Sequence, residues 1–391
     1  MIRIDTAERR RRLGIRHHLA PGSIAADVVE VARDLVGLHA SDPSSVYLQA
    51  FARTDRLAHA ALETELYDRR RLLKVLGMRR TMFVVPVDVA GIINAACTRT
   101  IGVTERRRTL QMLAVAGVAD DVERWLAEVE AATVTALERA GEATAADLAK
   151  VVPGLRVQIP FGAGKKWQGK VGVSTRMLFL LAAEGRIIRA RPKGSWLSSL
   201  YRWAPMDRWV PGGLPNHPPT EAQAELARRW LLTFGPGTQR DLQWWAGWTV
   251  ADTKRALAAV GAVEVELDEG RGFVLPDDTG STGPTEPWIA LLPGLDATTM
   301  GWNARAWYLG EHGPAIFDRN GNAGPTIWVD GRIVGGWAQA ADGRVVYRLL
   351  EDAGLDVERA VAARAAVIGD WLGHSRVIPR FRTPLESELS A

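Results

Sequence analysis

An α+β fold with three tandem winged-helix units in a curved array is the fold class that the sequence predicts. Three observations lead to it. A helix–helix–helix–hairpin order occurs three times along the chain. Two helices open with the same Thr-x-x-Asp-Leu pattern, at 144–148 and 238–242. The chain then changes to short runs with Gly, Pro and Asp-Gly turns, which predict a C-terminal β-rich segment and a terminal helix.

The first unit, with an N-terminal arm and connecting helices, is expected over residues 1–124. Residues 25–40 carry apolar side chains at helical spacing, and His39 falls on that stripe. Asp42-Pro43 then has the N-cap and the first-turn proline of another helix. A polar helix near 57–70 and a β-like run at 81–85 complete the unit.

The second unit is expected over 125–217, the third over 218–287 and the β-rich segment over 288–391. In each Thr-x-x-Asp pattern the Thr caps a helix while the acid at the third position reaches back. The pattern therefore predicts helix starts at Thr144 and Thr238. In the last segment we expect a helix from about 356 to 372, followed by a frayed dozen residues.

Basic residues are concentrated in the second unit. Residues 150–210 hold twelve Lys or Arg against Glu184 and Asp207, a balance of +10, whereas the whole chain carries +4. Clustered cations with interleaved aromatics are typical of a nucleic-acid surface. A solvated basic face above a core that contains the Trp side chains would give the same pattern. The predicted DNA contacts are Lys165, Lys166, Trp167, Lys170, Arg176, Arg191 and Lys193.

Composition excludes several classes of site. The single Cys97 allows no internal disulfide, zinc finger or iron–sulfur cluster, and the seven His residues form no HxH, HExxH or HxxxH pair. The GAGKK loop at 162–166 lacks the phosphate-loop pattern, so it is read as a DNA-backbone contact or a simple surface loop. No metal or other cofactor is predicted. The sequence also shows no signal peptide and no apolar stretch of the ~20 residues that span a membrane, so we expect a cytoplasmic, nucleoid-associated protein.

The candidate catalytic residues are His39, Ser41 and Asp42, between the first two predicted helices. A structural interpretation is available for each: His39 belongs to an apolar stripe near a helix end, and Ser41 and Asp42 can cap the next helix. A catalytic interpretation is also available, because an imidazole whose ordinary pKa is about 6.5 can accept a proton from water near neutral pH.

The stretches LVGLHASDPSSVYLQAFAR and RLLKVLGMRRTMFVVP resemble the opening of the AlkZ-like winged-helix DNA glycosylases. The later segments LLPGLDATTMGWNAR and IFDRNGNAGPTIWVDGRIVGGW are similar to that family too. The resemblance implies removal of bulky alkylated bases or crosslinks from double-stranded DNA, without a cofactor and by a monomer. It also implies a DNA-probing hairpin near the turn at 321–325, which makes Arg319 and Asn320 candidate contacts.

The family's catalytic motif is a Gln, an apolar residue and then Gln or Asp. The resemblance places His39, Ala40 and Ser41 on these positions, so neither polar position holds the usual residue. His39 is then the expected general base and Ser41 a water-orienting hydroxyl, and Asp42 either orients His39 or supplies negative charge, in competition with its role as an N-cap. A non-catalytic DNA-binding regulator and a protein that sequesters a small molecule on its Trp-rich surfaces are the alternative functions.

Overall fold

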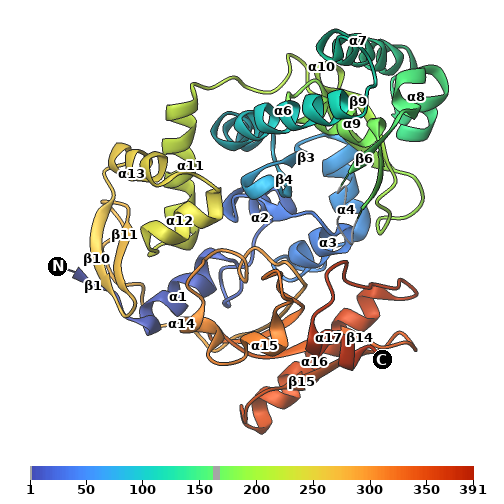
Figure 1. The fold of residues 1–391 in the computed structure, drawn as a ribbon. Helices are drawn as coiled ribbons and strands as arrows, with labels where there is room; N and C mark the ends of the chain where they lie inside the picture. Colours follow the sequence, from blue (N-terminus) through green and yellow to red (C-terminus); the bar gives the residue numbers. More distant parts are fainter. Residues whose placement is uncertain (1, 162–167) are drawn as a thin grey trace. The chain divides into compact units, whose positions relative to one another are not determined.

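A computed structural model describes residues 2–161 and 168–391 (Figure 1). The chain divides into two compact units. The first unit comprises residues 1–63, 83–86 and 223–391, and the second comprises residues 64–82 and 87–222. Helices and strands alternate in both units, which confirms a mixed α+β fold. The four segments expected from the sequence follow chain order, whereas the first compact unit joins the N-terminal residues to the C-terminal half.

The first unit begins with a short strand and a capped helix. Asp5 caps helix α1 by accepting the backbone N–H of Glu8, and strand β1 pairs in parallel with β10. Strand β2 ends at the candidate residue His39 and pairs antiparallel with β4. The bounds are β1 Ile2–Arg3, α1 Thr6–Arg16, α2 Val28–Asp34, β2 Leu38–His39, α3 Pro43–Phe51, α4 His59–Glu63 and β4 Met82–Pro86.

Helix α2 is shorter than the sequence predicts. It spans only Val28–Asp34 of the helix expected over 25–40, so the expected extent and the place of His39 on its apolar stripe are wrong. The backbone turns at Val36 and Gly37, whose φ angles are 53° and 113°. A Cβ on Gly37 would lie 2.7 Å from Cγ1 of Val85, so the close approach of β4 requires a glycine at this turn. His39 consequently lies on strand β2.

Three helices and a hairpin follow in the first unit. Gly237 forms an isolated bridge with Phe273 on β11, and Thr238 and Asp241 make the reciprocal capping box expected from the sequence. Asp241 is fully buried, and its other oxygen accepts the N–H groups of Asn303 and Ala304. The bounds are α11 Pro219–Phe234, α12 Gln239–Ala246, α13 Val250–Ala259, β10 Val263–Leu267 and β11 Gly270–Val274.

The C-terminal segment is built on an antiparallel four-stranded sheet in the order β12-β13-β14-β15. The predicted terminal helix is present as α16, but the residues after it are not frayed. Helix α17 buries Leu385 at 3% exposure, so this expectation is wrong. The bounds are β12 Ile289–Leu292, α14 Ala306–Leu309, α15 Gly313–Ile316, β13 Thr326–Val329, β14 Arg332–Gln339, β15 Val345–Leu349, α16 Leu355–Leu372 and α17 Pro384–Leu389.

The second unit starts with short elements and one long helix, α6. It continues with a helix, a short strand, a second helix, a two-stranded antiparallel pair, a third helix and a final hairpin. Strands β5, β9 and β8 form one sheet in that spatial order, and Thr144 caps α8 as predicted. Trp203 and Trp209 are buried, so these two aromatic residues belong to the core. The early elements are η1 Thr64–Asp68, β3 Leu72–Leu76, η2 Met78–Arg80, α5 Val87–Ile93, η3 Asn94–Thr98 and α6 Arg99–Val115. The later elements are α7 Val122–Ala140, β5 Ala143–Thr144, α8 Ala145–Val151, η4 Pro153–Arg156, β6 Gln158–Phe161, β7 Gly169–Gly172, α9 Val173–Ala183, β8 Ile187–Pro192, β9 Tyr201–Pro205 and α10 Met206–Trp209.

Candidate active site

The three candidate catalytic residues lie together in the loop from strand β2 to helix α3. His39 ends β2 opposite Phe83 of β4, and the centroids of their rings are 5.5 Å apart. Its exposed fraction is only 5%. Ser41, two residues further on, is half-buried. The loop therefore presents one largely covered imidazole and one more accessible hydroxyl group.

Asp42 is the N-cap of helix α3, as its place before Pro43 predicts. Its Oδ1 accepts the backbone N–H of Ser44 at 3.0 Å and the Ser44 hydroxyl at 2.7 Å. Its Oδ2 accepts the backbone N–H of Arg380 at 2.9 Å. Both carboxylate oxygens are thus engaged by backbone N–H groups and a hydroxyl that fix the start of α3.

Gln49 holds the backbone of His39 in place. This fully buried side chain of α3 accepts the N–H of His39 at 3.2 Å and donates to the carbonyl of the same residue at 2.9 Å. It also donates to the carbonyl of Ser45 and accepts the N–H of Ala297. An amide has two donor hydrogens and two acceptor lone pairs, so all four are used. Sequence reasoning missed Gln49, although a Gln within the apolar run VYLQAF indicates a helix buried on several sides.

A buried ion pair lies next to this amide. Arg53 donates to both carboxylate oxygens of Asp296, at 2.9 and 2.7 Å, and both side chains are fully buried. A further N–H of Arg53 reaches the hydroxyl of Thr298, which also contacts Nδ1 of His17. Burial and the adjacent Arg53 lower the pKa of His17 well below its ordinary value. Sequence reasoning missed this network because Arg53 and Asp296 are 243 residues apart.

Arg319 and Asn320 are exposed in a tight loop between α15 and β13. Phe317 and Ala323 form an antiparallel bridge at its base. Asp318 accepts the backbone N–H groups of Asn320 and Asn322, which fixes the shape of the loop. The two predicted contacts therefore lie at the tip of a closed turn.

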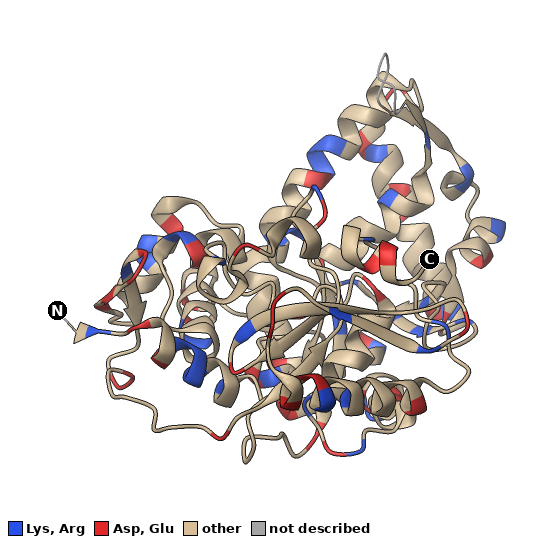
Figure 2. Cartoon of the chain, turned by 90° about the horizontal axis from the view of Figure 1, so that it is seen from below, with Lys and Arg blue, Asp and Glu red and all other residues tan. Residues whose placement is uncertain are grey.

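The predicted basic surface is only partly free of ion pairs. Arg176 contacts Glu105 at 3.2 Å and Arg191 contacts Asp68 at 2.9 Å. Figure 2 shows acidic and basic segments side by side along the helices. Lys170 on β7 and Lys193 in the turn after β8 are exposed, and neither has an ion pair within residues 2–161 and 168–391. Lys165, Lys166 and Trp167 lie outside the described residues.

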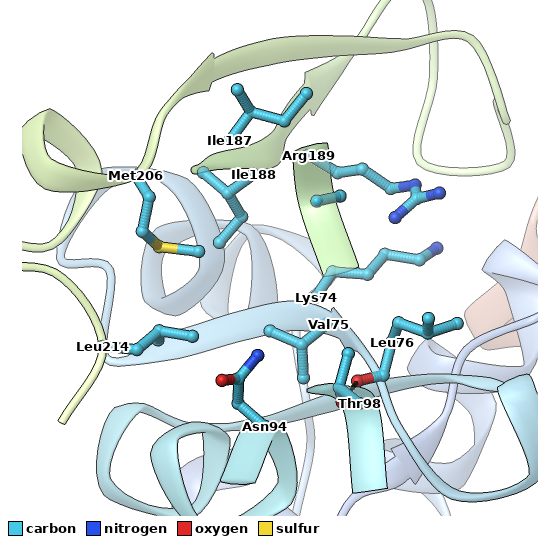
Figure 3. Close-up of a pocket in the computed structure, with 11 residues that line it drawn as sticks. Lys74, Val75, Leu76, Asn94, Thr98, Ile187, Ile188, Arg189, Met206 and Leu214 are labelled. Atoms are coloured by element: carbon cyan, nitrogen blue, oxygen red, sulfur yellow. Dashed lines mark hydrogen bonds between the residues drawn. The ribbon is translucent and has the colours of Figure 1, made fainter. Parts of the chain in front are cut away.

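Another residue of the basic segment, Arg189, is directed inward. In Figure 3 its guanidinium lies on the same side of a pocket as the ammonium of Lys74. Arg189 stacks over the ring of Trp203 at 4.5 Å, Lys74 donates to the hydroxyl of Tyr201, and burial lowers the pKa of Arg189 to about 10. The pocket has a volume of about 10 Å³, space for about one water molecule. These two cations therefore belong to the interior of the second unit.

Over residues 2–161 and 168–391, no three His, Cys, Asp or Glu side chains are grouped so that they could hold a metal ion. In the same ranges no helix is both long and apolar enough to cross a membrane.

Comparison with known proteins gives a consistent assignment. Residues 32–373 match the family described as "DNA glycosylase AlkZ-like". In fold, the chain is similar to Streptomyces sahachiroi DNA glycosylase AlkZ, with a TM-score of 0.74 and 20% identity over 97% of this chain and 100% of the other. No curated protein matches the sequence. Because the family match spans most of the chain, the protein belongs to the AlkZ-like DNA glycosylase family.

Proposed function

We propose that this protein is a monofunctional DNA glycosylase that hydrolyses the N-glycosidic bond of bulky N7-alkylated purines in double-stranded DNA. Such an activity would serve DNA repair or resistance to a DNA-alkylating antibiotic. The observation that carries the proposal is the β2–α3 loop. The sequence resemblance matches its residues to the positions of the family's catalytic motif, and Gln49 and Asp42 hold its backbone by hydrogen bonds.

The chemistry needs little from the protein. A purine alkylated at N7 is cationic, so it leaves as a neutral base without a general acid. The oxygen of water forms a bond to C1′ of the sugar as the C1′–N9 bond breaks, and the electron pair of that bond remains with the base. In this proposal His39 accepts a proton from the attacking water, and the Ser41 hydroxyl orients that water molecule by a hydrogen bond. Asp42 maintains the loop, since its oxygens are already engaged.

We further propose that three segments are tandem winged helices that act as the DNA-binding framework. The second, from α7 to β9, has the helix–strand–helix–helix–hairpin order of that fold with η4 and the β6–β7 pair inserted between α8 and α9, and its sheet runs β5-β9-β8. The third, α11 to β11, has the same order, with the Gly237–Phe273 bridge in place of the first strand pair. Exposed Lys170, Lys193, Arg319 and Asn320 are the proposed contacts within the described residues, and Arg176 and Arg191 would exchange an acid for a phosphate.

The test is release of a purine base from duplex DNA that contains one bulky N7-alkylguanine. We expect the free alkylated base and an abasic site to form in equal amounts, with no release from the unmodified duplex. Release of an unmodified base, or of none, would contradict the proposal.

A second candidate is a non-catalytic DNA-binding regulator with the same framework. The burial of His39 and the absence of Gln or Asp at either motif position favour this alternative. Tight binding of the alkylated duplex without base release would select it.

A further inference from the structure

The segment that follows α16 returns to the candidate active site. Gln339 at the end of β14 fixes its path, because it donates to the carbonyl of Ser375 at 3.0 Å and accepts the N–H of Val377 at 2.8 Å. Val377 is buried, and Val377 and Pro379 line a small cavity beside Asp42. This segment lies beyond residue 373, where the family match ends.

Arg380 makes two contacts with the β2–α3 loop. Its backbone N–H donates to Asp42 Oδ2 at 2.9 Å, and Nη1 of its side chain donates to the carbonyl of Ser41 at 3.3 Å. The residue is exposed, and among the described residues its guanidinium takes part in no ion pair. A guanidinium has five N–H donors in a planar fork, so most of them stay available to a further acceptor.

We propose that Arg380 binds a phosphate of the DNA backbone next to the nucleotide whose base is excised, and that it acts as a positioning residue. The inference rests on the proposed function. A cation at the reacting sugar would oppose the positive charge of an oxocarbenium-like transition state, so the charge suits the adjacent phosphate better than C1′. Arg is also well matched to phosphate, which it can contact through two parallel N–H groups.

The variant Arg380→Ala tests the contribution of the side chain separately from that of the backbone N–H. It retains the N–H that Asp42 accepts, and it removes the side chain beyond Cβ together with the guanidinium's hydrogen bond to the Ser41 carbonyl. Arg376→Ala is a matched control, because Arg376 is exposed in the same segment and also donates to a backbone carbonyl, that of Ala340. Duplex affinity and single-turnover excision would be measured from low to high salt, together with the melting temperature of each variant.

For Arg380→Ala we expect about tenfold weaker duplex binding and a log–log salt slope that is smaller by about 1, since the variant cannot neutralise that phosphate. The excision rate at saturating DNA should stay within about threefold of wild type, and Arg380→Lys should restore the salt slope. An unchanged slope in Arg380→Ala, or an equal weakening in Arg376→Ala, overturns the proposal. Wild-type protein that binds but releases no base overturns the glycosylase function instead, and the binding measurements still test the phosphate contact.

Discussion

Gln49 is the side chain on which the geometry of the candidate site most depends. Its replacement by Leu would leave the N–H and C=O of His39, the N–H of Ala297 and the carbonyl of Ser45 without their present partner. We expect Gln49→Leu to lower the free energy of unfolding by about 2–5 kcal/mol, because buried polar groups left unsatisfied are costly. Urea denaturation measures this. Gln111→Leu, at an exposed position on α6, is the control and should change stability by less than about 0.5 kcal/mol.

His39 gives the sharpest test of chemistry against structure. General-base catalysis typically contributes about 10²–10⁴-fold, so His39→Ala should lower single-turnover excision by about that factor while DNA affinity stays nearly the same. Ser41→Ala should cost less, because it removes one orienting hydrogen bond. If His39 serves only to pack against Phe83, the variant will melt at a lower temperature yet excise at the wild-type rate per folded molecule.

At the scale of elements, helix α1 depends on one buried carboxylate. Burial raises the pKa of Glu8, but hydrogen bonds from Arg12, the Thr282 N–H and Arg11 outweigh it and lower the pKa to about 2. A carboxylate with a depressed pKa stabilises the fold above its unfolded pKa, and this contribution is lost as pH falls.

For Glu8 this stabilisation is lost as the pH falls from the ordinary pKa of 4.5 to the folded-state pKa of about 2. We therefore expect wild type to exceed Glu8→Gln in stability by about 3 kcal/mol near neutral pH, with the difference shrinking between pH 5 and 2. Denaturation of both proteins across this range is the measurement. Glu128→Gln, which alters an exposed pair with Arg124, should show little change at any pH. A difference for Glu8→Gln that does not depend on pH would contradict the prediction.

Elements with local signals were predictable, and those set by distant contacts were not. Asp42, Thr144 and Thr238 cap helices as expected, because a cap and its partner are two or three residues apart. The end of α2 was missed, since the positive φ angles of Val36 and Gly37 occur where Gly37 approaches Val85 of β4, which lies far away in sequence. Helix α17 was missed because its buried residues contact strand β14, far away in sequence.

At the scale of the whole molecule, the candidate site is assembled from remote parts of the chain. The sequence could predict the loop that carries His39, Ser41 and Asp42, because a resemblance and a cap pattern both lie there. It could not predict Arg380, which is 338 residues from Asp42 and follows no periodic pattern. The sequence also could not predict how much of the positive charge of 150–210 is paired, because Arg176 and Arg191 contact acids outside that segment. Net charge along the sequence therefore overstates the charge available to DNA.

This distinction between paired and available cations leads to a prediction about DNA affinity. Lys170 and Lys193 are exposed and outside the ion pairs of the described residues, whereas Lys150 of the same basic segment contacts Asp147 at 2.8 Å. For each phosphate that the protein no longer neutralises, the log–log salt slope should fall by about 0.9. Lys170→Gln with Lys193→Gln should therefore lower the slope by about 2 and weaken binding most at low salt. Lys150→Gln should change the slope much less, because its charge is already offset by Asp147.

Fluorescence titration of one duplex at several salt concentrations compares the three proteins directly. If Lys150→Gln has the larger effect, or the double variant binds like wild type at every salt concentration, the DNA does not contact this basic segment, and its surface must be sought around Arg319 and Arg380.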